Sequence, residues 1–342
     1  MRFGYWMPVF GGWLRNVADE GMSIAWSEVR DLALQSERDG FDLTLLAELN
    51  LNDIKGHRAP SLDAWTLAPA LAAVTSTLEL MLAVRPNYHA PALTAKALST
   101  LDLIAPGRVS LNVVSSWWRD EAEQYGAPFD VHDARYARTE EWLGVLRRLL
   151  TEQTVDHEGP LYTLRGTVVE PKPSRPPTVY MGGESPRGKE VIAAQGSAYV
   201  MHGDPPEVIA GKIAEMEARR AALGRPPFRY GVSGFVICRD TPGEADAELA
   251  RVLDVRSSPA AYASYADFLA GSQLESQVSL EEYSVSNRGL RAGLIGTPEQ
   301  IIRRIRDYAA AGVDLLLLQF SPQAGEMARF GAQVIDPYRA AA

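Results

Sequence analysis

Two adjacent tryptophans, Trp117 and Trp118, lie in a polar run that starts at Asn112 and continues to Glu121. This combination suits a planar aromatic ligand, because the indole rings can form walls while Asn112 and Ser115 offer hydrogen bonds. The alternative is that the tryptophans simply cover the mouth of a barrel. The run is therefore a candidate for binding an aromatic cofactor or substrate.

A glycine-rich turn further along the chain has the composition of a phosphate site. Residues 182–188 include Gly183 and Ser185 and lead directly into a predicted helix. Glycine lets the backbone approach a phosphate, the N–H groups at a helix start attract it, and Ser185 can donate a hydroxyl hydrogen bond. A serine followed by proline is also an ordinary helix start. Glu184, in the middle of the turn, would have to point away from the phosphate.

Arg135 and Tyr136 form a second phosphate-binding candidate, at the start of the helix predicted over 135–150. The guanidinium supplies charge and the phenol supplies a hydroxyl donor. Asp133, two residues before Arg135, is equally consistent with a helix cap and with a role in the site. The pair therefore adds to the phosphate-binding character of the chain.

The histidines are dispersed and match no metal-ligand spacing, so no metal site is expected. His89 and His202 each follow a predicted strand and are candidates for moving a proton. The chain has no nucleophile elbow of the G-x-S-x-G type. An aromatic, polar and phosphate-binding site without a nucleophile indicates a cofactor that carries the chemistry.

Short apolar strands and amphipathic helices alternate along the chain and would position these residues. The predicted strands are 3–7, 43–47, 78–84, 109–114, 178–181, 198–201, 230–238 and 313–319. The predicted helices are 26–38, 62–74, 92–104, 135–150, 187–195, 207–222, 242–255 and 298–311. Parallel strands need crossover helices, so this pattern predicts an α/β fold, a (β/α)8 TIM barrel with its site at the carboxyl ends of the strands. No glycine-rich dinucleotide turn follows the first strand, which argues against an open sheet.

Two segments interrupt the alternation. Residues 155–170 are predicted to form a β-hairpin excursion, and the polar segment 257–291 is predicted to be a lid-like insertion between strands seven and eight. We expect one domain over residues 1–342, because barrels of this kind form a single unit of at least about 250 residues.

Composition limits the class of protein further. Apolar residues make up 46% of the chain, which allows a sizeable core, and the net charge of −9 argues against a nucleic-acid partner. Cys238 is the only cysteine and lies in an apolar run, so we interpret it as a core residue. The strand-like run 3–7 leaves no room for a leader, and no apolar stretch is long enough to span a membrane, so we expect a cytoplasmic protein.

Several blocks together resemble a known family. Residues 111–121 with 124–126, then 133–136, 180–185 and 292–298, resemble in order the bacterial-luciferase-like FMN-dependent monooxygenases. The similarity spans nearly the whole chain and is closest to the dimethylsulfone, alkanesulfonate and pyrimidine-ring-opening monooxygenases. It implies FMN used as FMNH2, O2 as co-substrate, a separate NAD(P)H:flavin reductase and a homo-oligomer, either a dimer or a tetramer.

The resemblance also implies two groups of cofactor-binding residues. The phosphate would be held by Arg135, Tyr136, Gly183 and Ser185. The flavin ring would be flanked by Glu48, Leu49, Asn112 and Glu121.

The chain departs from the alkanesulfonate pattern at the substrate side. Ser233 and Phe235 stand where those enzymes have an arginine and a histidine, and Ser321 stands where they have an aromatic hydroxyl. Arg288 and Arg291 in the insertion could still meet an anionic substrate. The sulfonate assignment therefore loses its best support, and the region 231–235 looks closer to the dimethylsulfone type.

We therefore expect a two-component monooxygenase that inserts one oxygen atom of O2 into a small organic substrate, such as a sulfone or sulfonate. Trp6, Trp117, Trp118 and the insertion would exclude water, and Phe235 would line the substrate side. His89 or His202 would move the proton. The alternatives are an F420-dependent oxidoreductase on the same fold, a non-catalytic flavin-binding relative and a flavin-free barrel.

Overall fold

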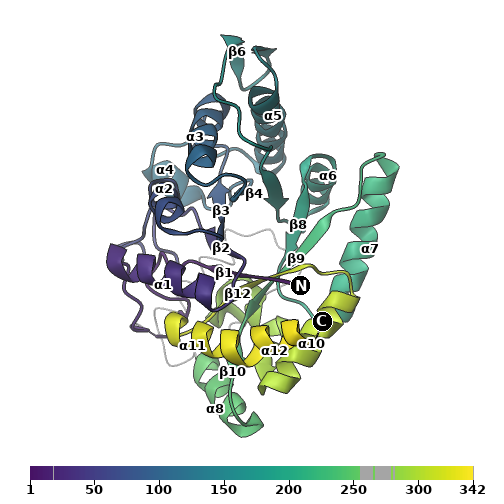
Figure 1. The fold of residues 1–342 in the computed structure, drawn as a ribbon. Coiled ribbons are helices and arrows are strands. Elements are labelled where there is room, and N and C mark those ends of the chain that lie inside the picture. Colours follow the sequence, from purple (N-terminus) through teal and green to yellow (C-terminus); the bar gives the residue numbers. More distant parts are fainter. Residues whose placement is uncertain (18, 255–264, 266–278, 280–281, 342) are drawn as a thin grey trace.

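The computed structural model describes residues 1–17, 19–254, 265, 279 and 282–341, without the side chains of 286–288. Eight parallel strands form a closed barrel in the order β1-β12-β9-β8-β7-β4-β3-β2. The barrel strands are β1 (Arg2–Trp6), β2 (Leu43–Leu46), β3 (Glu79–Val84), β4 (Val109–Val113), β7 (Thr178–Met181), β8 (Ala198–Met201), β9 (Arg229–Phe235) and β12 (Leu315–Gln319). The predicted TIM barrel is confirmed (Figure 1).

Helices cover the outside of the barrel. They are α1 (Trp26–Arg38), α2 (Ala64–Val74), α3 (Pro91–Ile104), α5 (His132–Thr151), α6 (Pro186–Gln195), α7 (Pro206–Ala222), α8 (Pro242–Leu253) and α10 (Pro298–Ala310). Each lies where the sequence pattern predicts a helix, with ends shifted by a few residues. Within the described ranges, no helix combines the length and the apolar character needed to cross a membrane.

Outside the insertion, four helical pieces of the described chain are not among the predicted elements. They are α4 (Arg119–Gln124), α11 (Gln323–Phe330), the π-helical turn η3 (Gly331–Ile335) and α12 (Asp336–Ala340). All are short, and α4 carries almost only polar side chains, so none shows the long apolar period that identifies a helix in sequence.

The prediction of one strand over 230–238 is wrong at its end. β9 ends at Phe235, and β10 (Ile237–Cys238) leaves the barrel to pair in parallel with β11 (Ile295–Gly296). The residues around the break, 235–238, are all apolar, so the pattern gives no sign of it. Cys238 is buried in β10, as expected.

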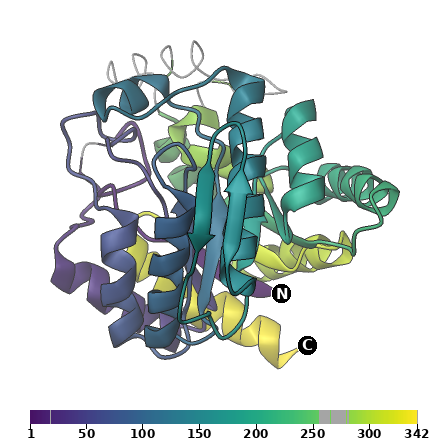
Figure 2. The same ribbon diagram turned by 90° about the horizontal axis from the view of Figure 1, so that it is seen from above.

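The hairpin predicted at 155–170 is confirmed as the antiparallel pair β5 (Val155–Glu158) and β6 (Thr163–Thr167). It lies outside the barrel beside α3 and α5 (Figures 1 and 2). Glu141 on α5 holds it, because its carboxylate pairs with His157 at 3.0 Å and accepts the backbone N–H of Tyr162 at 3.0 Å. The hairpin tip reaches the loop after β3, where the Tyr162 hydroxyl donates to the carbonyl of Pro86 at 3.3 Å.

Most of the predicted lid, 257–291, lies outside the described residues. Its end is described as two short 3-10 helices, η1 (Glu282–Ser284) and η2 (Ser286–Ala292). Gly289 in η2 lies against the backbone of Phe235, where a Cβ on the glycine would come within 2.7 Å of the Phe235 nitrogen. The insertion therefore returns to the barrel over the end of β9.

Candidate cofactor site at the barrel mouth

Two inward side chains near the carboxyl ends of the strands, those of Trp6 and Asn112, keep some solvent exposure. Asn112 pairs in register with Ala83 and Tyr180, two members of the cluster that fills the barrel, so it shares their inward face. Trp6, at the end of β1, packs against the same cluster and is only partly buried. These residues form the floor of the mouth, at the place where the sequence analysis put the ligand.

Arg85 is buried at the side of this mouth, immediately after β3, and the sequence analysis did not single it out. Its guanidinium pairs with both carboxylate oxygens of Glu121, with the Nη2–Oε1 contact at 3.1 Å. Its backbone N–H donates to Glu48 Oε2 at 2.7 Å, and its Nε lies 3.6 Å from the same carboxylate. Burial alone would lower the pKa of Arg85, but Glu121 raises it overall. One guanidinium thus joins the loops after β2 and β3 to α4.

The carboxylate of Glu121 is fully buried and already engaged. Besides Arg85, it accepts backbone N–H groups from Asn50 and Leu51 in the loop after β2, and the Tyr88 hydroxyl at 3.3 Å. Burial raises the pKa of Tyr88 to about 12. Glu121 therefore fixes the loop that was predicted to flank the flavin ring.

His89 lies in the loop after β3, and its Nε2 is hydrogen-bonded to Glu48. Its ring centroid lies 5.1 Å from that of Trp65 on α2, and its carbonyl accepts the indole N–H of Trp142 at 2.8 Å. Of the two residues predicted on the loop after β2, Glu48 is buried in this pair and Leu49 is half-buried beside it. The ring of His89 is thus held in one orientation, with its Nδ1 on the opposite side from Glu48.

Tyr136, Gly183 and Ser185 come together, as the sequence analysis expects. A Cβ on Gly183 or Gly188 would lie 3.0 or 2.7 Å from the phenol oxygen of Tyr136, so only glycine lets the phenol approach so closely. Gly183 has a φ of +154°, a conformation that side chains rarely adopt. Ser185 is the N-cap of α6 and accepts the N–H of Gly188 at 3.1 Å. The phenol, the turn and the start of α6 form one cradle, which we call the phosphate turn.

Arg135 faces a different side of α5 from Tyr136, because neighbouring residues of a helix point about 100° apart. Its guanidinium donates to the carbonyl of Ser116, which has a left-handed φ of 58°, and lies 4.7 Å from the ring centre of Phe129. Burial lowers the pKa of Arg135, and the nearby Arg119 adds to this effect. Its Nε and the hydroxyl of Ser116 are buried and make no hydrogen bond to any residue that the structure describes.

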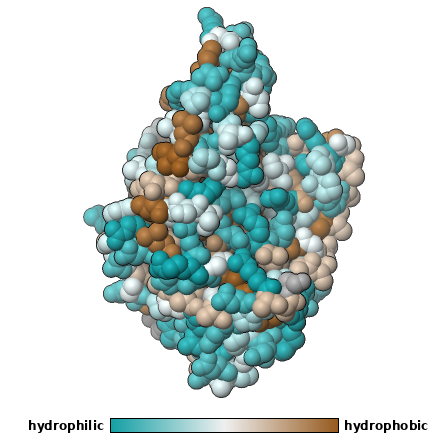
Figure 3. All heavy atoms as spheres, viewed as in Figure 1, coloured by the Kyte–Doolittle hydropathy of each residue, from teal (hydrophilic) through white to brown (hydrophobic). Residues whose placement is uncertain are grey.

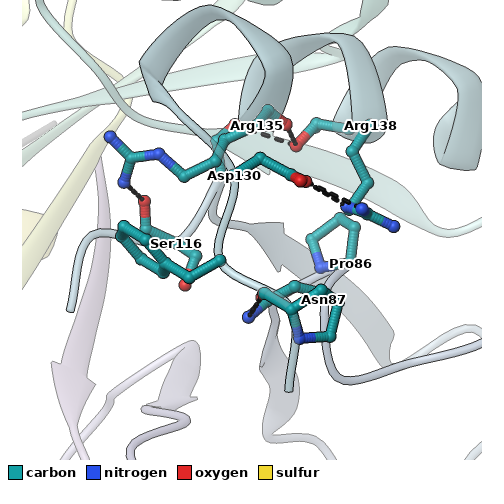
Figure 4. Close-up of a pocket in the computed structure, with 10 residues that line it drawn as sticks. Pro86, Asn87, Ser116, Asp130, Arg135 and Arg138 are labelled. Carbon is teal, nitrogen blue, oxygen red and sulfur yellow. Dashed lines mark hydrogen bonds and ion pairs between the residues drawn. The ribbon is translucent and has the colours of Figure 1, made fainter. Parts of the chain in front are cut away.

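Figure 4 shows a small pocket beside Arg135. Arg138, on the next turn of α5, pairs across it with Asp130 at 2.7 Å, while Arg135 reaches toward Ser116. Pro86 and Asn87, from the loop after β3, close the other side. The loops after β3 and β4 are thereby fastened to the start of α5.

The two tryptophans stack on each other instead of forming two facing walls. Their rings are parallel within 5° with centroids 5.5 Å apart, and Trp117 is 38% exposed. Trp118 contacts the ring of His57 in the loop after β2 at 5.0 Å. They cover the rim between the loops after β2 and β4.

Glu184 points away from the phosphate turn, as predicted. Its carboxylate pairs with Lys212 on α7 at 2.8 Å, and Lys212 also pairs with Asp204 in the loop after β8 at 2.7 Å. Arg291, predicted to meet substrate, lies 2.9 Å from Asp204 and 3.0 Å from Glu282. The side chain of Arg288 lies outside the described residues.

Two further predicted residues have distinct surroundings. Phe235 is 1% exposed beneath η2, so its side chain is covered in this arrangement, and its place on the substrate side stays a prediction. His202 follows β8 and is half-buried at the mouth. Within the described ranges, no group of three or more histidine, cysteine, aspartate or glutamate side chains could hold a metal ion.

The donors at the mouth fit an FMN molecule. The phosphate turn offers a phenol, a serine and a helix start to a dianion, and Arg135 brings a guanidinium whose Nε is unpaired. Tyr136 and Asn112 make no side-chain hydrogen bond within the described part of the chain, so both polar groups are available. An anionic tail and a polar aromatic ring system would both be satisfied.

The fold and the mouth define a cofactor-binding (β/α)8 barrel, and the comparisons with known proteins make this specific. The family model described as luciferase-like monooxygenase matches residues 1–315, and the chain belongs to this family. An FMNH2-dependent dimethylsulfone monooxygenase of Pseudomonas putida is 32% identical over 351 residues, covering 99% of this chain and 95% of that protein. The family predicted from the sequence is confirmed.

Solved structures share the barrel at lower identity. The EDTA monooxygenase of Chelativorans sp. BNC1 has a TM-score of 0.80 and 19% identity, over 99% of this chain and 94% of that one. An F420-dependent secondary alcohol dehydrogenase has a TM-score of 0.72 and 19% identity, over 98% of both chains. These structures support the fold alone, which a monooxygenase and an F420-dependent dehydrogenase share.

Proposed function

We propose that this protein is an FMNH2-dependent monooxygenase that inserts one oxygen atom of O2 into a small organosulfur compound such as a sulfone or sulfonate. The observation that carries the proposal is the 32% identity, over 99% of the chain, to the dimethylsulfone monooxygenase of Pseudomonas putida. The phosphate turn supports it independently, because FMN carries the dianion that such a turn binds.

Reduced FMN, when bound, supplies the electrons that activate O2. Tyr136, Ser185 and the start of α6 hold its phosphate, and Gly183 leaves room for it. Arg135 adds a positive charge from the neighbouring face of α5. Asn112, on the floor of the mouth, offers its amide to the polar edge of the ring, while Arg85 and Glu121 keep the loop with Glu48 and Leu49 beside it.

The remaining residues keep water out and move a proton. Trp6 closes the floor, and the stacked Trp117 and Trp118 cover the rim, which protects reactive species from hydrolysis. His89, oriented by Glu48, is the proton donor or acceptor on one side of the mouth, and His202 is the candidate on the other side.

A neutral sulfone suits the mouth better than a sulfonate. Arg291 is already paired with two carboxylates, and Ser233 replaces a cation found in alkanesulfonate enzymes. A sulfonate that binds Arg291 would have to displace the carboxylates of Asp204 and Glu282. We therefore favour an uncharged substrate with sulfonyl oxygens.

The protein works with a separate NAD(P)H:flavin reductase, in the cytoplasm where the nicotinamide is available.

The protein also forms a homo-oligomer. Exposed apolar residues support this: Leu93, Leu103 and Ile104 on α3 are 74%, 65% and 43% exposed, and brown side chains gather over α3 in Figure 3. Light scattering should find a dimer or tetramer that Leu103→Glu dissociates, whereas Leu223→Glu, at the exposed end of α7, should leave it intact. A monomeric wild-type protein would contradict this part.

A cofactor titration tests the proposal against its rivals. We expect FMN to bind with quenched fluorescence and F420 not to bind, after which sulfones and sulfonates are screened with a flavin reductase, NADH and O2. Binding of F420 without FMN would indicate a hydride-transferring oxidoreductase. FMN binding without product from any substrate would indicate a non-catalytic flavin-binding relative. A protein that binds neither flavin nor F420 would be a flavin-free barrel.

A further inference from the structure

The phosphate turn contains an acid at its centre, and this conflicts with binding a dianion. Glu184 stands between Gly183 and Ser185, at the start of α6, where the helix dipole attracts negative charge. A carboxylate there competes with a phosphate for that field and repels it.

Lys212 on α7 resolves this conflict. Its ammonium lies 2.8 Å from Glu184 Oε1, and the Glu184 side chain is only 7% exposed, so solvent screens the pair weakly. The contact both draws the carboxylate out of the turn and offsets its charge. Lys212 is an ion-pair partner of the acid, and it approaches from α7, whereas the phosphate turn leads into α6.

The pair continues into a chain of alternating charges that anchors Lys212. Its ammonium also lies 2.7 Å from Asp204, and Asp204 in turn pairs with Arg291 of η2 at 2.9 Å. Asp204 is held at its backbone as well, because its carbonyl accepts the Tyr308 hydroxyl at 2.7 Å. Lys212 is thereby fixed between two neighbouring loops of the mouth.

Two other cations of α6, Arg187 and Lys189, pair with carboxylates on neighbouring helices. Arg187 pairs with Glu140 at 2.9 Å, and Lys189 pairs with Glu215 on α7 at 2.9 Å. The Lys189–Glu215 pair joins the same two helices as Lys212 does, but its carboxylate belongs to α7 and not to the phosphate turn. It is a matched control for the loss of one lysine between these helices.

We infer that Lys212 is a positioning residue for FMN, which neutralises Glu184 and so makes the turn at Gly183 and Ser185 able to bind the cofactor phosphate. The inference rests on the proposed function, because it assumes that the phosphate occupies this turn. It assigns Lys212 an effect on cofactors with a phosphate and none on flavins without one.

The test compares the affinities of FMN and riboflavin, which differ only by the phosphate, using fluorescence titration of the purified protein. Lys212→Met should weaken FMN binding by on the order of tenfold and leave riboflavin binding unchanged. Glu184→Gln should bind FMN at least as tightly as the wild type. The double variant Glu184→Gln/Lys212→Met should recover most of the lost affinity, since the repelling charge is gone.

The outcomes separate the two claims. A wild type that binds FMN no better than riboflavin would overturn the phosphate turn itself, and the inference with it. A wild type that prefers FMN, with Lys212→Met unchanged or weakened equally toward both flavins, would overturn the inference alone. So would an equal loss in Lys189→Met, or a double variant no better than Lys212→Met. If Lys212→Met does not fold, Glu184→Gln and the double variant decide, and weakened FMN binding in both means a structural role.

Discussion

At the residue scale, Arg85 shows how one buried charge organises the mouth. The carboxylate of Glu48 approaches it from the loop after β2, and that of Glu121 approaches it from α4. The Arg85 side chain itself is only 1% exposed. Taking these charges out of water is costly, and the cost is offset only while the partners stay together. The stability of the cluster is therefore sensitive to the loss of either the positive charge or one of the negative charges.

Removing the guanidinium should destabilise the fold strongly. We expect Arg85→Met to lower the free energy of unfolding by about 3–5 kcal/mol, because it leaves two buried carboxylates without their cation. Urea denaturation followed by circular dichroism measures this. Arg30→Met, which removes an exposed pair with Asp31, should change it by less than about 1 kcal/mol. Similar stability of the two variants would mean that Glu48 and Glu121 do not depend on Arg85.

At Gly188, a substitution that normally stabilises a helix should weaken cofactor binding. Alanine normally stabilises a helix relative to glycine by about 1 kcal/mol, but here its Cβ would meet the Tyr136 phenol at 2.7 Å. We expect Gly188→Ala to weaken FMN binding several-fold and to leave riboflavin binding unchanged. Gly211→Ala on α7 is the control, because nothing lies within 4 Å of its Cβ. Unaltered FMN affinity in Gly188→Ala would remove Tyr136 from the phosphate site.

Cys238 should be inert in the native protein. Burial raises the pKa of its thiol to about 11, so the reactive thiolate is disfavoured in the folded state at neutral pH. Because the folded-state pKa is the higher one, the proton is held more tightly when folded, and protection is lost only as the pH rises toward 11. Iodoacetamide should label the chain at about pH 8 only after denaturation. Rapid labelling of the native protein under those conditions would contradict the burial.

At the element scale, the helices and strands of the barrel could be predicted from the sequence. The place where β9 ends and β10 pairs with a different strand could not. Each barrel strand is a short apolar run between turn residues, so its position is visible in the sequence. The break between β9 and β10 is not visible, because the run stays apolar while its partner changes from β12 to β11. A change of partner is a property of the tertiary fold alone.

The hairpin β5–β6 depends on one acid of α5. Glu141 accepts the N–H of Tyr162 and pairs with His157, so we expect Glu141→Ala to loosen the hairpin without unfolding the barrel. Limited proteolysis should then cut within 155–167 several times faster than in the wild type. Glu140→Ala, which removes only the pair with Arg187, should be cut at the wild-type rate. Equal rates in both variants would show that other contacts hold the hairpin.

At the scale of the whole molecule, the phosphate turn was visible in the sequence and the charged cluster around Arg85 was not. Tyr136 and the turn at Gly183 each carry a local signal, a glycine or a phenol at a helix start, and the barrel brings them together. Arg85 carries no local signal, because its partners come from other strands. Glu121 was expected near the flavin, and its role there stays a prediction, as does the lid, most of which lies outside the described residues.

The most direct test of the account is an isotope experiment with the complete two-component reaction. The protein is supplied with FMN, a flavin reductase, NADH and dimethylsulfone under ¹⁸O₂, and the products are analysed by mass spectrometry. If the protein inserts one oxygen atom of O2, a product carries a single ¹⁸O atom and forms only when both the protein and reduced flavin are present. Complete conversion of the consumed oxygen to hydrogen peroxide, with no labelled product from any sulfone or sulfonate, would contradict it.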